Sequence, residues 1–231
     1  MKKKCCRLSA FGCPLSAFGT SLRFGYAQQP FHPFTISLLH SFTISLFRYM
    51  QLNGLILCGG QSSRFGSDKS QVIIDNMPQY LRIKNALLPY CQNVFISCRA
   101  EQTHLFEQEQ IIADTQSAGP MSGLITAIAH NNLCGWLLVA CDWLNVSSKH
   151  IEQLCAHRNP RYPAVCYVDE QQRKQPLLSI YEPNIFDTVT TAYTKGNKSL
   201  KNVLDTTNCY CLNSPLLFFN RVDDLPPNDK L

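Results

Sequence analysis

From Leu52 onward, the chain alternates short apolar runs with stretches in which apolar residues recur at helical spacing. Short apolar runs predict buried strands, and recurrence every three to four residues predicts amphipathic helices. The predicted strands are residues 52–57, 94–97, a strand ending at 111–112, 136–140, 164–168 and 177–181. The predicted helices are residues 78–88, 104–108, 122–130, 147–156, 183–192 and 199–204, and a last apolar run follows at 216–219.

This alternation of strands and helices predicts an α/β fold, a three-layer sandwich with a mostly parallel, Rossmann-like sheet between two layers of helices. Residues 136–140, with the sequence WLLVA, are continuously apolar, so we expect this strand to be buried on both faces. The polar link DEQQRKQP between the last two strands predicts a small antiparallel β-arm. In such sheets ligands bind beyond the carboxyl ends of the strands, so the segments that follow the strands are the candidate site.

The first 49 residues differ from the rest of the chain. LSAFG occurs at residues 8–12 and 15–19, and FTISL occurs at 34–38 and 42–46, which matches no solenoid period. The segment is basic and rich in hydroxyl groups, as transit peptides are, and glycine and proline interrupt the apolar core that a signal peptide needs. We interpret residues 1–49 as a repeat-containing extension outside the fold and residues 50–231 as the domain, with Met50 as its natural start.

The positive charge of the chain comes from this extension. Residues 1–49 hold six of the 21 lysines and arginines and none of the 16 acidic residues, so the remainder carries 15 basic against 16 acidic side chains. A near-neutral body without a basic stripe is not typical of a nucleic-acid-binding protein. No run approaches the ~18 apolar residues of a membrane span, so we expect neither a nucleic-acid nor a membrane partner.

The chain contains 12 cysteines, and three of them lie in the extension. Most of the others sit inside apolar runs, where a free cysteine behaves as a small hydrophobic residue. The closest pair in the body, Cys209 and Cys211, does not have the spacing of zinc ligands. Cys211 is either a buried inert thiol or a reactive one. This cysteine usage predicts a reducing, cytoplasmic compartment.

The segment LCGGQSSRFGSDKS, residues 57–70, follows the first predicted strand. Gly59 and Gly60 allow a sharp turn in which backbone N–H groups face an anion. Arg64 and Lys69 add positive charges suited to phosphate oxygens. The lysine does not follow a glycine directly, as it does in a P-loop, which disfavours a P-loop kinase or ATPase. Taken alone, the segment could equally be a solvated glycine-rich turn.

Two aspartates follow later strands. Asp142 comes directly after the buried run WLLVAC, where a carboxylate either holds Mg²⁺ together with substrate phosphates or caps a turn. Asp114 follows the third strand. After it, Gly119 and Pro120 lead into a helix whose first N–H groups either face a ligand or belong to an ordinary connection.

In combination, these segments resemble the nucleotidyltransferases typified by molybdenum cofactor guanylyltransferase, whose opening loop reads roughly Leu-Ala-Gly-Gly-x-Ser-x-Arg-Met-Gly-x-Asp-Lys. The segments ADTQSAGPMSGL, LLVACDW, KQPLLSIY, GNKSLKNVL and FFNRVDDL are similar to later motifs of that family, in the same order. The resemblance covers nearly all of residues 52–225, so it identifies residues 50–231 as a nucleotidyltransferase domain. It implies transfer of GMP from GTP to the terminal phosphate of molybdopterin, with release of pyrophosphate.

The resemblance also implies roles for individual residues. Arg64, Lys69 and Asp142 would be catalytic, with the two cations neutralising the triphosphate and Asp142 binding the Mg²⁺ cofactor. The residues implied to bind the nucleotide are Leu57, Gly59, Gly60, Lys69, Asp114 and Gly119, with Asp114 at the ribose or base. The partners implied are GTP and molybdopterin, together with other molybdenum cofactor biosynthesis proteins or apo-molybdoenzymes.

The sequence departs from the family pattern at three places. Leu144 stands where the family has proline, Ser97 and Cys98 occupy the region of a base-binding asparagine, and Val222 replaces a second terminal asparagine. The Gly59-Gly60 pair, in place of Ala-Gly, favours the guanylyl over the cytidylyl branch. A cytidylyl- or sugar-phosphate nucleotidyltransferase on the same fold, and a degenerate relative that only binds nucleotide, remain alternatives.

Overall fold

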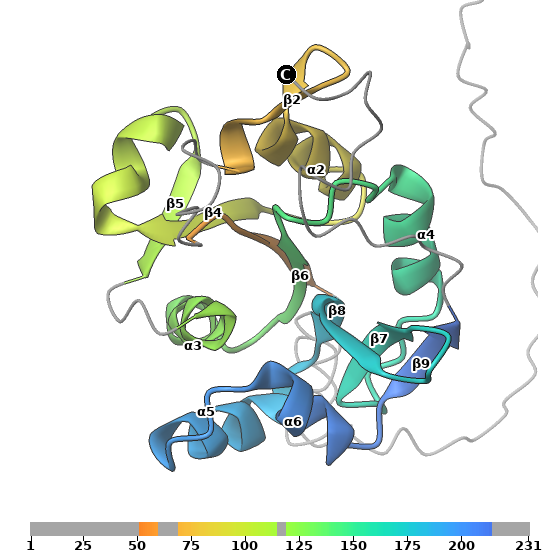
Figure 1. The fold of residues 1–231 in the computed structure, drawn as a ribbon. Coiled ribbons are helices and arrows are strands. Elements are labelled where there is room, and N and C mark those ends of the chain that lie inside the picture. Colours follow the sequence, from red (N-terminus) through yellow and green to blue (C-terminus); the bar gives the residue numbers. More distant parts are fainter. Residues whose placement is uncertain (1–50, 60–68, 115–118, 214–231) are drawn as a thin grey trace, which may run out of the picture. The chain divides into compact units, whose positions relative to one another are not determined.

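A computed structural model describes residues 51–59, 69–114 and 119–213 (Figure 1). All of these residues belong to one compact unit, residues 40–231. The predicted extension at residues 1–49 and the apolar run at 216–219 lie outside the described residues, so the domain boundary at residue 50 stays a prediction.

The described residues form nine strands, five α-helices and three short 3₁₀ helices. The strands are β1 (Leu52–Leu57), β2 (Ile73–Ile74), β3 (Met77–Pro78), β4 (Val94–Arg99), β5 (Gln110–Asp114), β6 (Gly135–Ala140), β7 (Ala164–Val168), β8 (Lys174–Tyr181) and β9 (Tyr210–Asn213). The helices are α2 (Gln79–Leu87), α3 (Pro120–His130), α4 (Ser148–Ala156), α5 (Phe186–Thr194) and α6 (Leu200–Asp205). The 3₁₀ helices are η1 (Lys69–Gln71), η2 (Ala100–Phe106) and η3 (Pro183–Ile185).

Seven strands form one sheet in the order β5-β4-β1-β6-β8-β7-β9, and β2 and β3 form a separate antiparallel pair. Within the main sheet only β8 runs antiparallel to its neighbours, so the predicted mostly parallel α/β sheet is confirmed. The predicted β-arm is the antiparallel hairpin β7–β8. It is built into the main sheet, because β8 also pairs with β6. Strands β2, β3 and β9 were not predicted.

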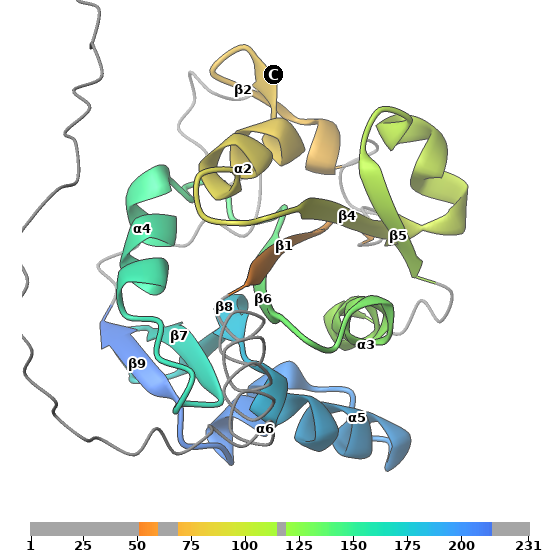
Figure 2. The same cartoon turned by 180° about the vertical axis from the view of Figure 1, so that it is seen from behind.

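Helices cover both faces of the sheet, as Figures 1 and 2 show, with α2 and α4 on one side and α3, α5 and α6 on the other. The central strand β6 serves both layers. Leu137 and Val139 belong to the core under α2 and α4, whereas Trp136 and Leu138 belong to the core under α3 and α5. All six residues of β6 are buried, which confirms the expectation drawn from its continuous apolar sequence.

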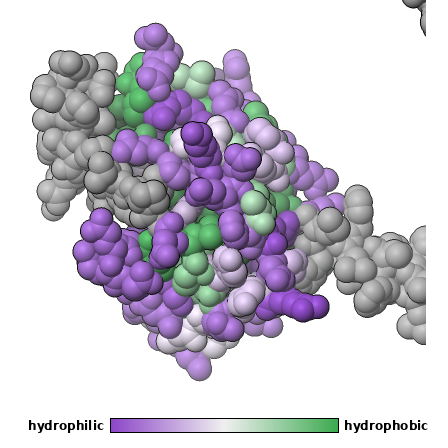
Figure 3. All heavy atoms as spheres, turned by 90° about the vertical axis from the view of Figure 1, so that its right-hand side faces the viewer, coloured by the Kyte–Doolittle hydropathy of each residue, from purple (hydrophilic) through white to green (hydrophobic). Residues whose placement is uncertain are grey.

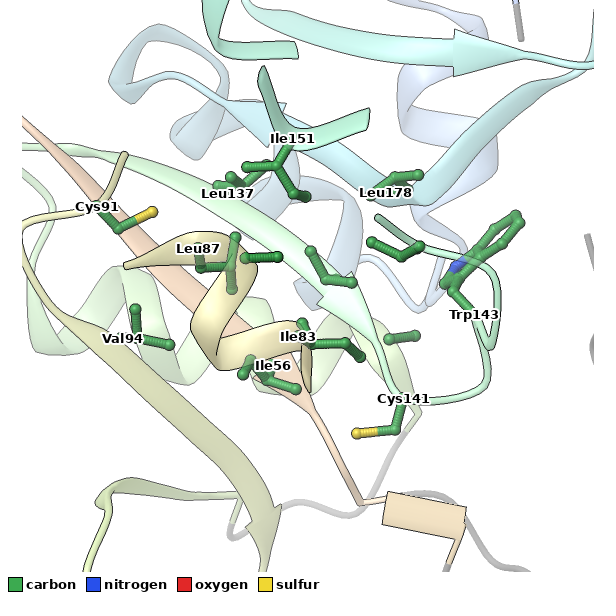
Figure 4. Packing of buried hydrophobic residues seen from close by; sticks show 14 of the residues in the cluster. Ile56, Ile83, Leu87, Cys91, Val94, Leu137, Cys141, Trp143, Ile151 and Leu178 are labelled. Carbon is green, nitrogen blue, oxygen red and sulfur yellow. The ribbon is translucent and has the colours of Figure 1, made fainter. Parts of the chain in front are cut away.

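The core on the α2 side is close-packed (Figure 4). Ile83 and Leu87 of α2 lie beside Ile56 of β1, and Ile151 of α4 lies beside Leu137 of β6. On the described part of the face formed by the α4 and β9 side, hydrophilic residues predominate and hydrophobic ones form small separate areas (Figure 3). Ile151 and Leu154 of α4 are buried, as the helical spacing of its sequence predicts.

Serine residues precede two of the predicted helices as N-caps. Ser147 precedes α4 as its N-cap, and its N–H donates to Nδ1 of His150 at 3.0 Å. Ser199 caps α6 by accepting a hydrogen bond from the N–H of Asn202 at 3.2 Å. The predicted helix at residues 104–108 is instead the 3₁₀ helix η2, which begins earlier because the side chain of Gln102 bonds to the N–H of Arg99 at 3.1 Å.

Within residues 51–59, 69–114 and 119–213, none of the helices has the length and apolarity that crossing a membrane requires.

Candidate active site

The candidate site lies where β5, β4, β1 and β6 end, because these four strands are parallel and share one carboxyl edge. Leu57 ends β1 in register with Ala140, the last residue of β6. Cys58 and Cys141 therefore begin two neighbouring loops, with their sulfur atoms 2.8 Å apart. The predicted nucleotide-binding loop and the predicted metal-binding loop leave the sheet side by side.

Asp142 lies in this edge with its carboxyl group mostly buried. Burial raises the pKa of Asp142, while the nearby positive charge of Lys69 acts in the opposite direction. The Oδ1 atom of Asp142 is buried and has no hydrogen-bond partner among the described residues. A buried carboxylate oxygen of this kind is costly unless it binds a cation or a donor. Lys69 and Asp142, both predicted in the site, thus lie near enough to interact electrostatically.

The loop after Asp142 is held by α2, which the sequence did not indicate. The Nε2 atom of Gln79 donates to the carbonyl oxygen of Trp143 at 3.0 Å. The Nη1 atom of Arg82 donates to the carbonyl oxygen of Leu144 at 3.1 Å and to Oε1 of Gln79 at 3.0 Å. Two carbonyl groups directly after the aspartate are therefore fixed by one helix.

Leu144, at the family's proline position, makes a backbone bond that proline cannot make. Its N–H donates to the carbonyl oxygen of Asp142 at 3.0 Å. Proline lacks this donor and instead fixes its own φ angle. At residue 144, a backbone hydrogen bond therefore restrains the loop where the family's proline would restrain the φ angle.

Gln79 also connects this loop to the segment that carries Lys69. The backbone N–H of Gln79 donates to the carbonyl oxygen of Val72 at 2.9 Å, and the N–H of Val72 donates to the carbonyl oxygen of Lys69 at 3.4 Å. Gln79 is fully buried. Its backbone bonds to the segment that carries Lys69, and its side chain bonds to the loop that follows Asp142. Gln79 therefore sets the relative positions of these two segments.

Asp114 ends β5, at the far side of the same edge. Its Oδ2 atom accepts a hydrogen bond from the hydroxyl of Ser122 in the first turn of α3, and that hydroxyl lies 2.7 Å from the carbonyl oxygen of Gly119. Gly119 has φ +87°, a left-handed conformation that glycine adopts without strain. The turn into α3 is thus fixed around Asp114.

Asp114 and Asp142 are too far apart to share a metal ion. Their strands, β5 and β6, are separated by β4 and β1, and neighbouring strands lie about 4.8 Å apart, so the two aspartates lie roughly 14 Å apart along the edge. This span suits the two ends of a nucleotide. The roles implied for the two aspartates, a ribose or base contact and a metal contact, stay predictions.

A second buried amide, that of Gln102, supports the start of the nucleotide loop. Its Nε2 atom donates to the carbonyl oxygen of Cys58 at 3.3 Å, and its Oε1 atom accepts from Nε of Arg99 at 3.1 Å. Gly59 follows directly. Gly60 and Arg64, which the sequence predicts in the site, lie outside the described residues.

A sequence model described as a MobA-like NTP transferase domain matches residues 54–209, which include this whole edge of the sheet. The chain belongs to the MobA-like NTP transferase family. It is therefore a nucleotidyltransferase, as predicted. The site residues themselves remain predictions.

Curated relatives point the same way. A molybdenum cofactor biosynthesis bifunctional protein from Synechocystis sp. is 32% identical over 171 residues, which cover 72% of this chain and 49% of that protein. The chain thus spans about half the length of this relative. A "probable molybdenum cofactor guanylyltransferase" from Bacillus cytotoxicus is 28% identical over 157 residues, or 65% of this chain and 78% of that protein.

Solved structures share the fold. Molybdopterin-guanine dinucleotide biosynthesis protein A from Archaeoglobus fulgidus has a TM-score of 0.56 and 19% identity, and the match covers 70% of this chain and 83% of that one. Rv0371c from Mycobacterium tuberculosis, solved in complex with manganese, has a TM-score of 0.56 and 12% identity, covering 78% and 96%. These likenesses show that the transferase shares its fold with both structures.

Replacement of Gly123 by alanine is expected to push the first turn of α3 away from the nucleotide edge. A Cβ atom there would lie 2.7 Å from Oγ of Ser97 and 2.8 Å from Cδ2 of Leu57. Overpacking costs about 1–3 kcal/mol, which exceeds the gain of roughly 1 kcal/mol from a better helix former. Thermal unfolding should show a lower midpoint, and titration should show weaker nucleotide binding. Ala129→Ser, on the exposed side of the same helix, is the control and should change neither.

Proposed function

We propose that this transferase moves GMP from GTP to the terminal phosphate of molybdopterin and releases pyrophosphate. One observation supports the proposal above all: Asp142 has a buried carboxylate oxygen without a hydrogen-bond partner among the described residues, and the positive charge of Lys69 acts to lower the pKa of that carboxyl group. The names of the curated relatives supply the guanylyl group and the molybdenum cofactor, and the name of the Archaeoglobus fulgidus protein supplies molybdopterin.

The residues present fit a divalent cation. Asp142 offers a buried carboxylate oxygen that lacks a hydrogen-bond partner among the described residues, and Mg²⁺ is commonly held by one or two carboxylates plus substrate phosphates. Mg²⁺ bound there would supply Lewis-acid stabilisation of charge on the phosphates. The manganese in the structure of Rv0371c supports a divalent cation in this fold.

The chain itself contributes charge and position. Lys69 places an ammonium group near Asp142, where it would neutralise the triphosphate together with Arg64. Leu57, Gly59 and Gly60 would line the nucleotide. The acceptor phosphate oxygen attacks the α-phosphorus of GTP in line with the leaving pyrophosphate, so orientation and charge neutralisation account for most of the catalysis.

Asp114 and Gly119 would hold the other end of the nucleotide. The carboxylate of Asp114 is oriented by the hydroxyl of Ser122, which belongs to the same turn as Gly119. A carboxylate that accepts hydrogen bonds from ribose hydroxyls or base N–H groups fits this position. We also infer that the enzyme acts in the cytoplasm and hands its product to other cofactor biosynthesis proteins or to apo-molybdoenzymes.

Incubation of the full chain with Mg²⁺, either GTP or CTP, and either molybdopterin or a sugar phosphate as acceptor tests the proposal. The expected result is pyrophosphate and the guanine dinucleotide cofactor from GTP, with little product from CTP. Preference for CTP would identify the cytidylyl alternative, and product from a sugar phosphate but not from molybdopterin would identify a sugar-nucleotide enzyme. Nucleotide binding without pyrophosphate release would identify a degenerate relative.

Replacement of Arg82 by alanine is expected to raise the Mg²⁺ concentration required for half-maximal activity about 10–100-fold, the usual cost of losing a group that orients a metal ligand. The change removes the hydrogen bond to the carbonyl oxygen of Leu144, two residues after Asp142. Arg82→Lys should restore part of the activity at low Mg²⁺. The measurement is a Mg²⁺ titration of pyrophosphate release.

The matched control for this variant is Asp75→Asn. Asp75 lies 3.7 Å from Nε of Arg82, and its side chain is 82% exposed, so its removal leaves the bond to Leu144 in place. Asparagine also tolerates the φ of 51° at this position. An unchanged Mg²⁺ requirement in Arg82→Ala, with lower stability alone, would show that Arg82 does not act through the metal loop.

A further inference from the structure

Three cysteines lie together on one face of the sheet, far along the strand order from Asp142. Cys166 of β7 is in register with Cys211 of β9, and their sulfur atoms are 3.9 Å apart. Cys209, two residues before Cys211, shares a side-chain hydrogen bond with Cys166. Alternate residues of an extended chain point to the same side, so the three thiols face the α6 side of the sheet. We refer to Cys166, Cys209 and Cys211 as the thiol cluster.

The three thiols differ in their access to solvent. Cys166 is buried, Cys209 is half-buried and Cys211 is exposed. The cluster thus opens to solvent through β9, which is an edge strand of the seven-stranded sheet. An oxidant in solution can reach the outer two thiols while the third stays inside the core. A reactive thiol with a second thiol behind it is the arrangement from which disulfides form on oxidation.

A lysine is held beside Cys209. The Nζ atom of Lys174 donates to the carbonyl oxygens of Leu204 at 2.6 Å and Thr207 at 3.0 Å, and the thiol of Cys209 donates to the same Leu204 oxygen at 3.6 Å. The hydrogen bond from Cys166 lowers the pKa of Cys209, burial acts in the opposite direction, and the Lys174 ammonium lowers the pKa further. The same hydrogen bond, followed by burial, raises the pKa of Cys166. Cys209 is therefore the thiol of this pair that loses its proton more readily.

Other described cysteines lack this combination. Burial raises the pKa of Cys134 to about 11 and the pKa of Cys155 to about 11. Cys58 and Cys141 are a second close pair, but each is only 4% exposed. Since the thiolate is the reactive form and solvent access is needed for reaction, these cysteines should react more slowly than Cys209.

We propose that the thiol cluster is an oxidation site, at which a hydroperoxide oxidises Cys209 and Cys166 then forms a disulfide with it. The Cys209 sulfur attacks one peroxide oxygen, the O–O bond breaks, and a sulfenic acid forms as the second oxygen leaves and takes up a proton. The Cys166 sulfur next attacks the sulfenic sulfur, the S–O bond breaks, and water leaves with the Cys166 proton. The two thiols lose two electrons, and hydrogen peroxide is reduced to two waters.

The test is oxidation of the reduced full chain by hydrogen peroxide, followed by peptide mapping without reduction. The expected first product is a Cys166–Cys209 disulfide, with Cys134 and Cys155 still reduced. Cys166→Ser should instead leave a sulfenic acid at Cys209 that a cyclic 1,3-dione traps. Cys211→Ser is the matched control, because it removes the most exposed thiol of the cluster and should leave the disulfide unchanged.

Two further variants test whether Cys209 is the thiol that is oxidised first. Cys209→Ser should abolish the rapid loss of a thiol from this cluster, and Lys174→Gln should slow the reaction at Cys209 while all cysteines are retained. A Cys58–Cys141 disulfide as the first product, or equal oxidation rates in the wild type and in Cys209→Ser, would overturn the assignment. The outcome is independent of the GTP reaction, because it is read from the thiols alone.

Discussion

Replacement of Asp142 by asparagine is expected to lower Mg²⁺-dependent pyrophosphate release by roughly 10³-fold, while the midpoint of thermal unfolding does not fall. Metal-ion catalysis contributes several kcal/mol, and each 1.36 kcal/mol is a factor of ten in rate. The neutral amide keeps the shape of the side chain but loses the charge that binds the cation. Steady-state pyrophosphate assays over a range of Mg²⁺ concentrations measure the effect.

The midpoint of thermal unfolding should not fall together with activity, because the native carboxylate of Asp142 is costly to bury. Its pKa is raised by burial, and its Oδ1 atom has no hydrogen-bond partner among the described residues, so the amide removes a desolvation penalty at the loss of an attraction to Lys69. Asp187→Asn on the exposed face of α5 is the control and should change neither quantity. Near-normal pyrophosphate release from the Asp142 variant would remove this residue from the metal site.

Replacement of Glu182 by alanine is expected to lower the free energy of unfolding by about 3–5 kcal/mol, the usual cost of breaking a buried ion pair by removing one partner. Glu182 is fully buried and accepts two hydrogen bonds from Arg158, at 2.6 Å from Nε and 3.0 Å from Nη2. Arg158 also donates to the carbonyl oxygen of Gln51 at 3.1 Å, so the pair connects the end of β8 to the start of β1. The variant leaves the guanidinium buried without its counter-charge.

Urea denaturation of the folded enzyme measures this change. The control is Asp205→Ala, which removes an exposed pair with Lys201 on α6 and should cost less than about 1 kcal/mol. Glu182→Gln, which retains a hydrogen-bond acceptor, should fall between the two. Equal midpoints for Glu182→Ala and Asp205→Ala would show that the buried pair does not stabilise the fold beyond an ordinary surface pair.

The sheet could be predicted because its strands are read from local sequence. The continuous apolar run of β6 and the period of α4 depend only on neighbouring residues, and the structure confirms both. The antiparallel hairpin β7–β8 was equally visible from its polar link. The position of β8 beside β6 was not, because the pairing of Val139 with Leu178 depends on the whole fold and not on either segment.

The supporting residues of the site could not be predicted for a similar reason. Gln79, Arg82 and Gln102 are polar residues in ordinary helical sequence, and each gains its role from a carbonyl group more than forty residues away. Strand β9 escaped prediction because its four residues alternate only weakly. The loop and the aspartates could be proposed from the sequence because Gly59 and Asp142 come two residues after strand ends and Asp114 ends β5, which are local properties.

The antiparallel strand β8 has a consequence for synthesis of the chain. Strand β6 pairs with β1 on one side and with β8 on the other, and β8 is the later of the two partners to leave the ribosome. Until then, one edge of a wholly apolar strand presents free N–H and C=O groups, which are a template for pairing with another chain. The interval between translation of Ala140 and of Tyr181 is therefore when the nascent protein most depends on chaperones to avoid aggregation.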